Sequence, residues 1–148
     1  MCDFENPLQS ANLGVSKNPS METTITEGIK ITVESNFRDD LSEVTGGSFF
    51  FNYHISMENR NSFAVQLIHR DWFIFDSLNE ANYVHGPGVI GEQPVLAPTE
   101  KFSYTSGCEL QSEIGFMNGF YTFLNVETGN QFRVNIPSFS LVYPPKLN

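Results

Sequence analysis

The sequence predicts an all-β fold, an antiparallel sandwich of two sheets with about seven strands. Three observations lead to this prediction. Segments of alternating apolar and polar residues recur along the chain, as expected for half-buried strands. Clusters of Gly, Asn, Asp and Ser separate these segments at regular intervals. No segment after residue 25 has a sustained helical period, and 148 residues suffice for one domain with its own core.

The first half of the chain contains three predicted strands. Residues 28–35 alternate with period two, and Gly46-Gly47 marks a turn before residues 48–57. In that second strand one face collects large apolar side chains, namely Phe49, Phe51, Tyr53, Ile55 and Met57. Residues 63–75 form a long strand whose apolar parity changes near His69. One extra residue reverses the facing of all later side chains, so we expect a β-bulge there.

The second half predicts shorter strands around one long loop. Residues 81–84 form a short strand, and residues 86–99 form a loop with three glycines and three prolines. Residues 101–106 alternate again. Residues 119–126 and 131–136 are predicted to pair as a hairpin, because the Thr-Gly-Asn between them is a good turn sequence.

Aromatic side chains are too numerous for one buried face. Phenylalanine alone occurs fourteen times. The only tryptophan, Trp72, lies on a long strand, and we expect it to anchor the core between the sheets. Phe50-Phe51 and Phe73–Phe75 are candidates for aromatics on an outer face. Exposed aromatics of this kind are typical of protein-binding or dimer surfaces.

Charge and hydropathy narrow the classes of partner. The formal net charge is −9, and no basic patch is present, which argues against nucleic acid and anionic lipid as partners. No apolar run approaches the ~18 residues of a membrane span. The amino terminus lacks the basic and apolar regions of a signal peptide, so a cytoplasmic location is expected. Cys2 and Cys108 are then expected to be free thiols.

The amino-terminal segment differs from the rest of the chain. Residues 1–24 are polar and lack periodicity, so they are predicted to form a flexible leader before a domain of residues 25–148. Met21 is a candidate alternative start, with residues 1–20 as an upstream addition.

The long loop contains the spelling G-x-G-x-x-G at Gly86, Gly88 and Gly91, which in Rossmann domains binds a dinucleotide pyrophosphate. There the motif opens a helix. Here two prolines four residues apart follow it and would break a short helix, and Glu92 would repel a phosphate. The glycines are predicted to shape a loop or a protein contact; an anion-binding nest of backbone amides is the alternative.

No catalytic arrangement is evident. The three histidines, His54, His69 and His85, lack metal-ligand spacing, so a metal site built from His69, Asp71 or His85 is only a weaker alternative. Cys108 has no local nucleophile signature. We therefore expect no enzymatic activity, no resident metal and no cofactor.

Several long motifs resemble the ApaG family, and together they extend over about residues 25–141. The matching segments are Val65–Leu67 with Arg70 and Trp72, Val89–Pro98, Phe102–Leu110, Gly115–Tyr121 and Ile136–Leu141. One segment departs from the family: many members have Ser-Arg-His-Trp where this chain has His69-Arg70-Asp71-Trp72, so Asp71 stands in place of the family's histidine. Any ligand role of that family histidine is therefore in doubt here.

The resemblance implies a fibronectin type III-like, immunoglobulin-type sandwich and no established enzymatic activity. Bacterial members are associated with cobalt resistance and magnesium efflux, and are often encoded beside a diadenosine tetraphosphate hydrolase. Related domains in F-box proteins and in a DNA-polymerase-delta-interacting protein resemble protein-interaction modules.

We therefore expect a non-enzymatic binding module whose partner is a protein, with a homodimer as one form of that partner. The predicted contact surface is the glycine loop with its neighbouring strand. Its residues are His85, Gly86, Gly88, Gly91, Glu92 and Gln93, with Arg70 and Trp72 as adjacent surface. The main alternative is a small-ligand sensor that binds a nucleotide or pyrophosphate at Gly86–Gly91.

Overall fold

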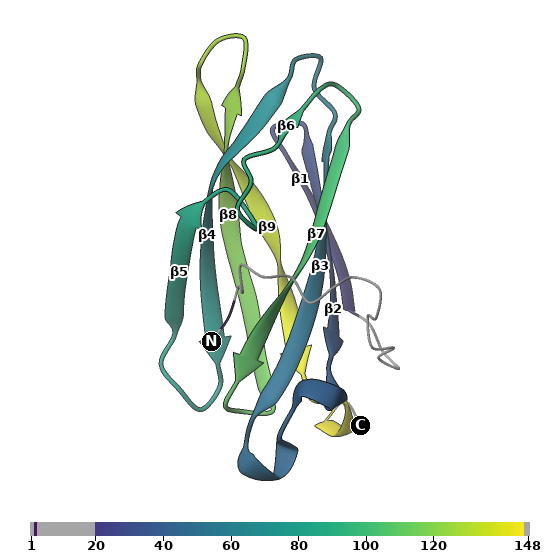
Figure 1. Cartoon of the computed structure of the whole chain (residues 1–148), viewed down its shortest axis with the longest axis vertical. Helices are drawn as coiled ribbons and strands as arrows, with labels where there is room; N and C mark the ends of the chain where they lie inside the picture. Colours follow the sequence, from purple (N-terminus) through teal and green to yellow (C-terminus); the bar gives the residue numbers. More distant parts are fainter. Residues whose placement is uncertain (1, 3–19, 147–148) are drawn as a thin grey trace.

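A computed structural model describes residue 2 and residues 20–146, and these form two antiparallel β-sheets packed face to face (Figure 1). One sheet has the order β1-β2-β3-β7 and the other β5-β4-β8-β9, with β6 paired to β4. The strands are β1 (Ser20–Thr26), β2 (Ile29–Phe37), β3 (Phe49–Asn59), β4 (Val65–Asp76), β5 (Asn82–Pro87), β6 (Val95–Leu96), β7 (Lys101–Leu110), β8 (Ile114–Asn125) and β9 (Gln131–Val142). Three 3-10 turns, η2 (Asp39–Leu41), η3 (Val44–Gly46) and η4 (Pro144–Lys146), complete the described elements.

The β-sandwich prediction is confirmed, but the strand count is nine rather than about seven. The two additional strands are β1 and the two-residue β6. β1 begins at Ser20, so residues 20–24, assigned to the leader from the sequence, are strand residues paired with β2. Its side chains are largely exposed, which explains why no apolar alternation marks it. Residue 1 and residues 3–19 of the expected leader lie outside the described part of the chain.

The inward faces of the two sheets form one apolar core. The five large side chains predicted on one face of β3 are all buried. Trp72 is fully buried and lies between the sheets, with its ring centroid 5.3 Å from that of Tyr53 on β3 and 6.0 Å from that of Phe139 on β9. The hydroxyls of Tyr104 on β7 and Tyr121 on β8 join the sheets by a buried hydrogen bond of 2.6 Å. The role of Trp72 as core anchor is confirmed.

The predicted bulge in β4 is present. The β4–β8 register shifts between Leu67 and His69, just before the segment where the apolar parity changes. Upstream of the shift Val65 and Leu67 face the core, and downstream Trp72 and Ile74 do so. His69, Asp71, Phe73 and Phe75 consequently share the opposite, outer face of this sheet.

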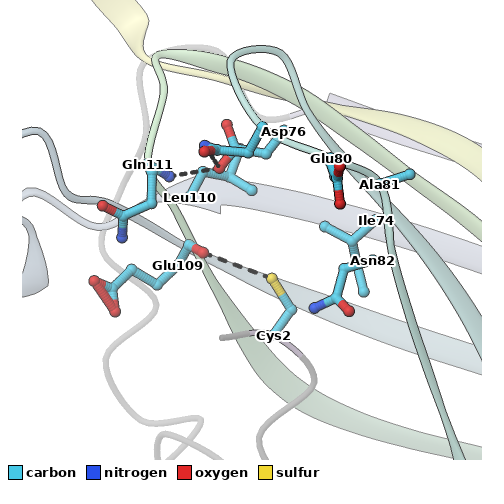
Figure 2. A pocket seen from close by; sticks show the side chains of 10 residues that line it. Cys2, Ile74, Asp76, Glu80, Ala81, Asn82, Glu109, Leu110 and Gln111 are labelled. Carbon is cyan, nitrogen blue, oxygen red and sulfur yellow. Dashed lines mark hydrogen bonds between the residues drawn. The ribbon is translucent and has the colours of Figure 1, made fainter.

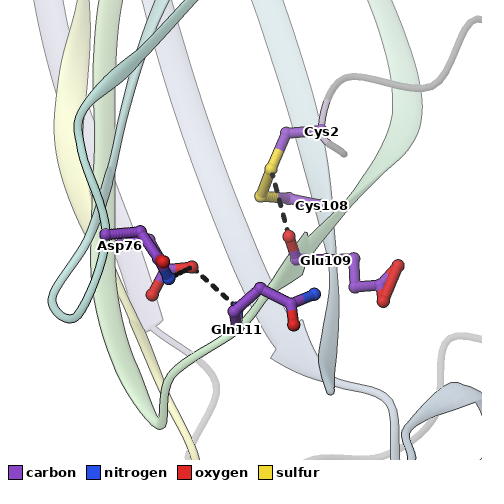
Figure 3. The surroundings of a disulfide bond; sticks show 6 residues. Cys2, Asp76, Cys108, Glu109 and Gln111 are labelled. Carbon is purple, nitrogen blue, oxygen red and sulfur yellow. Dashed lines mark hydrogen bonds between the residues drawn. A yellow bond between two sulfur atoms is a disulfide. The ribbon is translucent and has the colours of Figure 1, made fainter. Parts of the chain in front are cut away.

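Cys2 and Cys108 form a disulfide, which corrects the expectation of two free thiols (Figure 3). Cys108 lies on β7, and Cys2 makes an isolated bridge to it although the two are 106 residues apart in the sequence. Cys2 is buried, and its sulfur lies 3.7 Å from the carbonyl oxygen of Glu109. Sequence spacing cannot reveal such a pairing, because it depends on where the amino terminus meets the sandwich.

Candidate functional site

The glycine loop follows β5 without opening a helix. Gly86 is still a β5 residue, whereas Gly88 and Gly91 have left-handed φ values of 57° and 75°. A Cβ on Gly88 would lie 2.0 Å from the carbonyl oxygen of Glu92, so only glycine fits there. Ile90 between them also has a positive φ of 43°. The motif therefore makes a tight turn, as the absence of helix signals predicted.

Most polar groups of this turn bind other parts of the protein. The Gly88 amide donates to the carbonyl of Ile68, and Val89 and Glu92 exchange two backbone hydrogen bonds of 2.8 Å. The Gln93 side chain donates to the same Ile68 carbonyl. Two amides within the predicted nest of Gly86–Gly91, those of Gly88 and Val89, are thus already committed to internal acceptors.

The buried Arg70 side chain holds this turn in place. Its Nη1 donates to the carbonyl oxygens of Pro87 and Gly88 at 3.1 and 3.0 Å. A Cβ on Gly86 would lie only 3.1 Å from the same nitrogen, which explains the small residue there. Arg70 is 5% exposed and Trp72 is 0% exposed, so neither is available to a partner. Their assignment to the adjacent surface was wrong, because the bulge turns both inward.

Most of the remaining predicted residues lie at the surface, but they do not converge. His85, Glu92 and Gln93 are exposed, Gly91 is exposed at the tip of the turn, and Gly88 is buried. The His85 side chain lies on the outer face of β5, whereas Glu92 and Gln93 come after the turn in the chain. The loop is a shaped corner of the sandwich rather than a pocket of side chains.

The outer face of the β5-β4-β8 region carries a continuous set of rings, which we call the outer aromatic face. It consists of His69, Phe73, Phe75, Tyr83, His85, Phe116 and Phe120. Phe75 and Phe116 stack at 4.4 Å between centroids, and Phe73 and Tyr83 at 5.0 Å. Tyr83 is 49% exposed and Phe116 is 40% exposed. The prediction of outward aromatics at Phe73–Phe75 is confirmed for those two rings, whereas Phe51 is buried in the core.

Polar partners surround these rings. The Tyr83 hydroxyl donates a hydrogen bond to the Asp71 carboxylate, and this bond, with some desolvation, raises the pKa of Tyr83 above its usual value. The Arg133 guanidinium from β9 lies 4.2 Å from the centre of the Phe120 ring, a cation–π contact. The face thus combines apolar rings with a buried acid and a base at its border.

Two histidines meet on the same face. The rings of His69 and His85 lie 5.6 Å apart, and His85 stacks on Tyr83 at 5.0 Å. The register shift precedes His69, so His69 and Asp71 point to the same side. Across residue 2 and residues 20–146, no group of three or more His, Cys, Asp or Glu is arranged to hold a metal ion. His54 lies on the other sheet, with Nδ1 2.9 Å from the Thr105 hydroxyl oxygen.

Sequence reasoning missed Tyr83, Phe116 and Phe120 as members of this face. Their facing depends on the β4–β5 and β4–β8 registers, which pair residues far apart along the chain. Within each strand, only the alternation of inward and outward side chains could have indicated these rings. In β8 that alternation is interrupted, because the β8–β9 register shifts between Met117 and Gly119.

Known proteins similar to this chain agree with the fold. The ApaG domain family matches residues 39–125. A protein named ApaG from a Bradyrhizobium species is 43% identical over 84% of this chain and 95% of its own length, and one from Beijerinckia indica is 44% identical over the same shares. A crystal structure described as the putative ApaA protein from Bordetella pertussis is 33% identical, covers 88% of this chain and 98% of that one, and superposes with a TM-score of 0.74. The described residues contain no helix with the length and apolar character to cross a bilayer. The chain belongs to the ApaG family.

Proposed function

We propose that this chain is a non-enzymatic protein-binding module of the cytoplasm and that its partner contacts the outer aromatic face beside the glycine loop. The observation that carries this proposal is the exposure of Tyr83 and Phe116 within a continuous set of stacked rings. Aromatic side chains concentrated on one face are enriched in protein interfaces and supply large contact areas at low entropic cost.

The firmly held glycine turn supports the same proposal. Arg70 and the Gly88 amide fix the end of β5, which carries Tyr83 and His85. A rigid edge presents these side chains without an ordering cost when a partner binds. We further propose that the family's association with cobalt resistance and magnesium efflux operates through such a partner, with the module itself making the contact.

Affinity capture from a lysate of the source cells tests this proposal. The double variant Tyr83→Ser/Phe116→Ser removes two exposed rings, and Ile25→Ser removes a comparably exposed apolar side chain from β1 on the other sheet. We expect one protein to be captured by the wild type and Ile25→Ser but lost from the double variant. In hydrogen exchange, that protein should protect β5 and β8.

Equal capture by all three chains, with protection elsewhere, would refute the outer aromatic face as the contact. Circular dichroism of each variant establishes that the sandwich is intact. Both substituted rings are partly exposed, so we expect the double variant to fold like the wild type.

The His69–His85 pair supports a second candidate function, direct binding of a divalent transition metal. Imidazoles on neighbouring strands with centroids 5.6 Å apart can supply two nitrogen ligands to one ion. Titration with Co²⁺ and Mg²⁺, followed by NMR of the histidine rings, tests this function. Saturable Co²⁺ shifts of both rings that are lost in His85→Ala but kept in His54→Ala would support it. Unchanged ring signals would exclude it.

A further inference from the structure

The edge strand β5 presents backbone groups that no described residue satisfies. The Gly88 amide donates to Ile68, and the β4–β5 register pairs His69 with Pro87 and Asp71 with His85. Since antiparallel strands alternate between hydrogen-bonded and non-hydrogen-bonded pairs, the even-numbered β5 residues face β4. The N–H and C=O groups of Tyr83 and His85 therefore point away from the sheet.

Two of the other three sheet edges, β1 and β9, differ from β5. β1 and β9, which end the two sheets on one side, are joined by Thr24 and Thr26, whose hydroxyls bond the backbone of Asn135 at 2.9 and 3.3 Å. β5 lies at the far margin of its sheet, beside no other strand than β4 (Figure 1). A free strand edge is a template for adding another strand.

A hollow of 330 Å³ opens where β5 begins (Figure 2). Ile74, Ala81 and Leu110 give it apolar walls, while Asp76 and Glu80 bring carboxyl groups. The Glu109 carboxylate instead accepts a hydrogen bond of 2.8 Å from the Ser48 hydroxyl. Asp76 accepts hydrogen bonds through Oδ2 from the Gln111 amide and the Asn79 side chain. Its Oδ1 is buried and has no hydrogen-bond partner among the described residues. A buried carboxylate oxygen in this state favours a donor supplied from outside.

The exposed charged side chains on the segments that flank β5 are acidic, whereas Arg70, which binds the Pro87 carbonyl, is buried. From residue 71 to residue 100 the chain contains no Lys or Arg, but it contains Asp71, Asp76, Glu80, Glu92 and Glu100. Glu80 precedes β5 and Glu92 follows the turn at its other end, and both are exposed. A basic segment would therefore be attracted along the whole edge, whereas a second copy of this acidic chain would be repelled.

We infer that β5 binds an extended peptide that carries Lys or Arg, which adds to the sheet as a new strand beside Tyr83 and His85. A basic side chain at one end of the peptide enters the hollow beside Asp76 and Glu80. Outward side chains of the added strand continue the outer aromatic face next to Tyr83. This inference rests on the proposed protein-binding function and names its partner as a basic, extended segment.

Fluorescence anisotropy with two synthetic peptides tests the inference. One labelled heptapeptide alternates Lys with Val and Thr, and its counterpart has Glu at each Lys position. We expect saturable binding of the basic peptide alone, with slower exchange of the Tyr83 and His85 amides on binding. Binding of both peptides, or protection confined to other strands, would overturn the inference.

A pair of substitutions at one position isolates the backbone. His85→Pro removes an N–H that faces away from β4, so the β4–β5 ladder stays complete. His85→Ala keeps that N–H and removes only the imidazole. We expect His85→Pro to weaken binding of the basic peptide about tenfold more than His85→Ala does, because one backbone hydrogen bond is lost in addition to the imidazole contact. Equal affinity of the two variants would refute strand addition.

A second pair tests the charge. Glu80 is exposed, and Glu80→Gln should weaken the basic peptide about threefold at low salt, while Glu127→Gln in the distant β8–β9 turn should not. If capture in the lysate experiment depends on Tyr83 and Phe116 but not on the His85 amide, the proposed function stands and the edge inference fails. Concentration-dependent dimers abolished by His85→Pro would instead assign the edge to a second copy and overturn the inference.

Discussion

The hydroxyl of Tyr83 on the edge strand β5 donates a hydrogen bond to the carboxylate of Asp71 on β4. This contact ties the edge strand to its sheet through side chains, in addition to the backbone ladder. The Tyr83 ring also stacks on Phe73 and on His85, with 5.0 Å between centroids in each pair. The contact therefore connects the β5 rings of the outer aromatic face to β4.

The first prediction concerns pH. The Asp71 hydrogen bond raises the pKa of Tyr83, so the folded state holds this phenolic proton more tightly than the unfolded chain. The resulting stabilisation is complete below the unfolded pKa of about 10 and is lost as pH rises through the folded pKa. Ultraviolet titration of tyrosinate, taken as wild type minus Tyr83→Phe, should show the raised value. Asp71→Asn should return it toward normal; an unchanged titration would contradict the assignment.

The second prediction separates two glycines of the turn. Gly91→Ala adds a Cβ that meets nothing within 4 Å, so it should cost only the left-handed strain, about 1–2 kcal/mol. Gly88→Ala carries the same strain and also a Cβ 2.0 Å from the Glu92 carbonyl, so the backbone must move. Urea unfolding should rank Gly88→Ala as clearly more destabilising. Equal losses would mean that the turn is not as tight as described.

The third prediction concerns the core. Trp72→Ala should lower the free energy of unfolding by about 3–5 kcal/mol, because Trp72 is fully buried between Tyr53, Tyr121 and Phe139. Trp72→Phe keeps a ring and should cost less. The same denaturant series measures both variants, and a loss below ~1 kcal/mol for Trp72→Ala would show that the residue is not a core anchor.

The fourth prediction concerns the Cys2–Cys108 disulfide. Purified protein should resist alkylation until a reductant is added, and should then take up two labels. The disulfide joins residues 106 positions apart, so it should raise the free energy of unfolding by up to about 4–5 kcal/mol. Denaturant unfolding of the wild type and Cys2→Ser measures this difference. Disulfides are rare in the cytosol, so trapping thiols during cell lysis also checks the proposed cytoplasmic location. Two labels without reductant would refute the pairing.

The fifth prediction concerns the ligand-sensor alternative. The amides of Gly88, Val89 and Glu92 donate within the protein, so we expect no saturable shift of their NMR signals with pyrophosphate, ATP or diadenosine tetraphosphate. Saturable shifts confined to Gly86–Gly91 would revive the anion-binding nest and oppose this prediction. Pyrophosphate lacks the base and sugar of the two nucleotides, so its titration tests the anion chemistry that all three probes share.

Local patterns predicted much of the fold because strand alternation and turn chemistry act over a few residues. The inward faces of β3 and β4, the bulge before His69 and the β8–β9 hairpin all follow from such patterns. β1 was not predicted because its largely exposed side chains show no apolar alternation. It forms a strand through its backbone pairing with β2. Arg70 was assigned to the surface because its hydrogen bonds to Pro87 and Gly88 depend on the β4–β5 pairing, and the same surface assignment of Trp72 conflicted with its predicted role in the core.

By itself, the sequence determined an all-β sandwich, its acidic character and the absence of a Rossmann helix after the glycines, because spacing, charge and proline position are local properties. Only the tertiary structure decided which aromatic rings meet on one outer face, because Phe73, Tyr83 and Phe116 come together through strand registers between distant segments. It likewise decided that Arg70 serves the turn rather than a ligand, since its partners are the carbonyls of Pro87 and Gly88 across the sheet. Long-range pairing fixes such contacts, and no single stretch of residues encodes it.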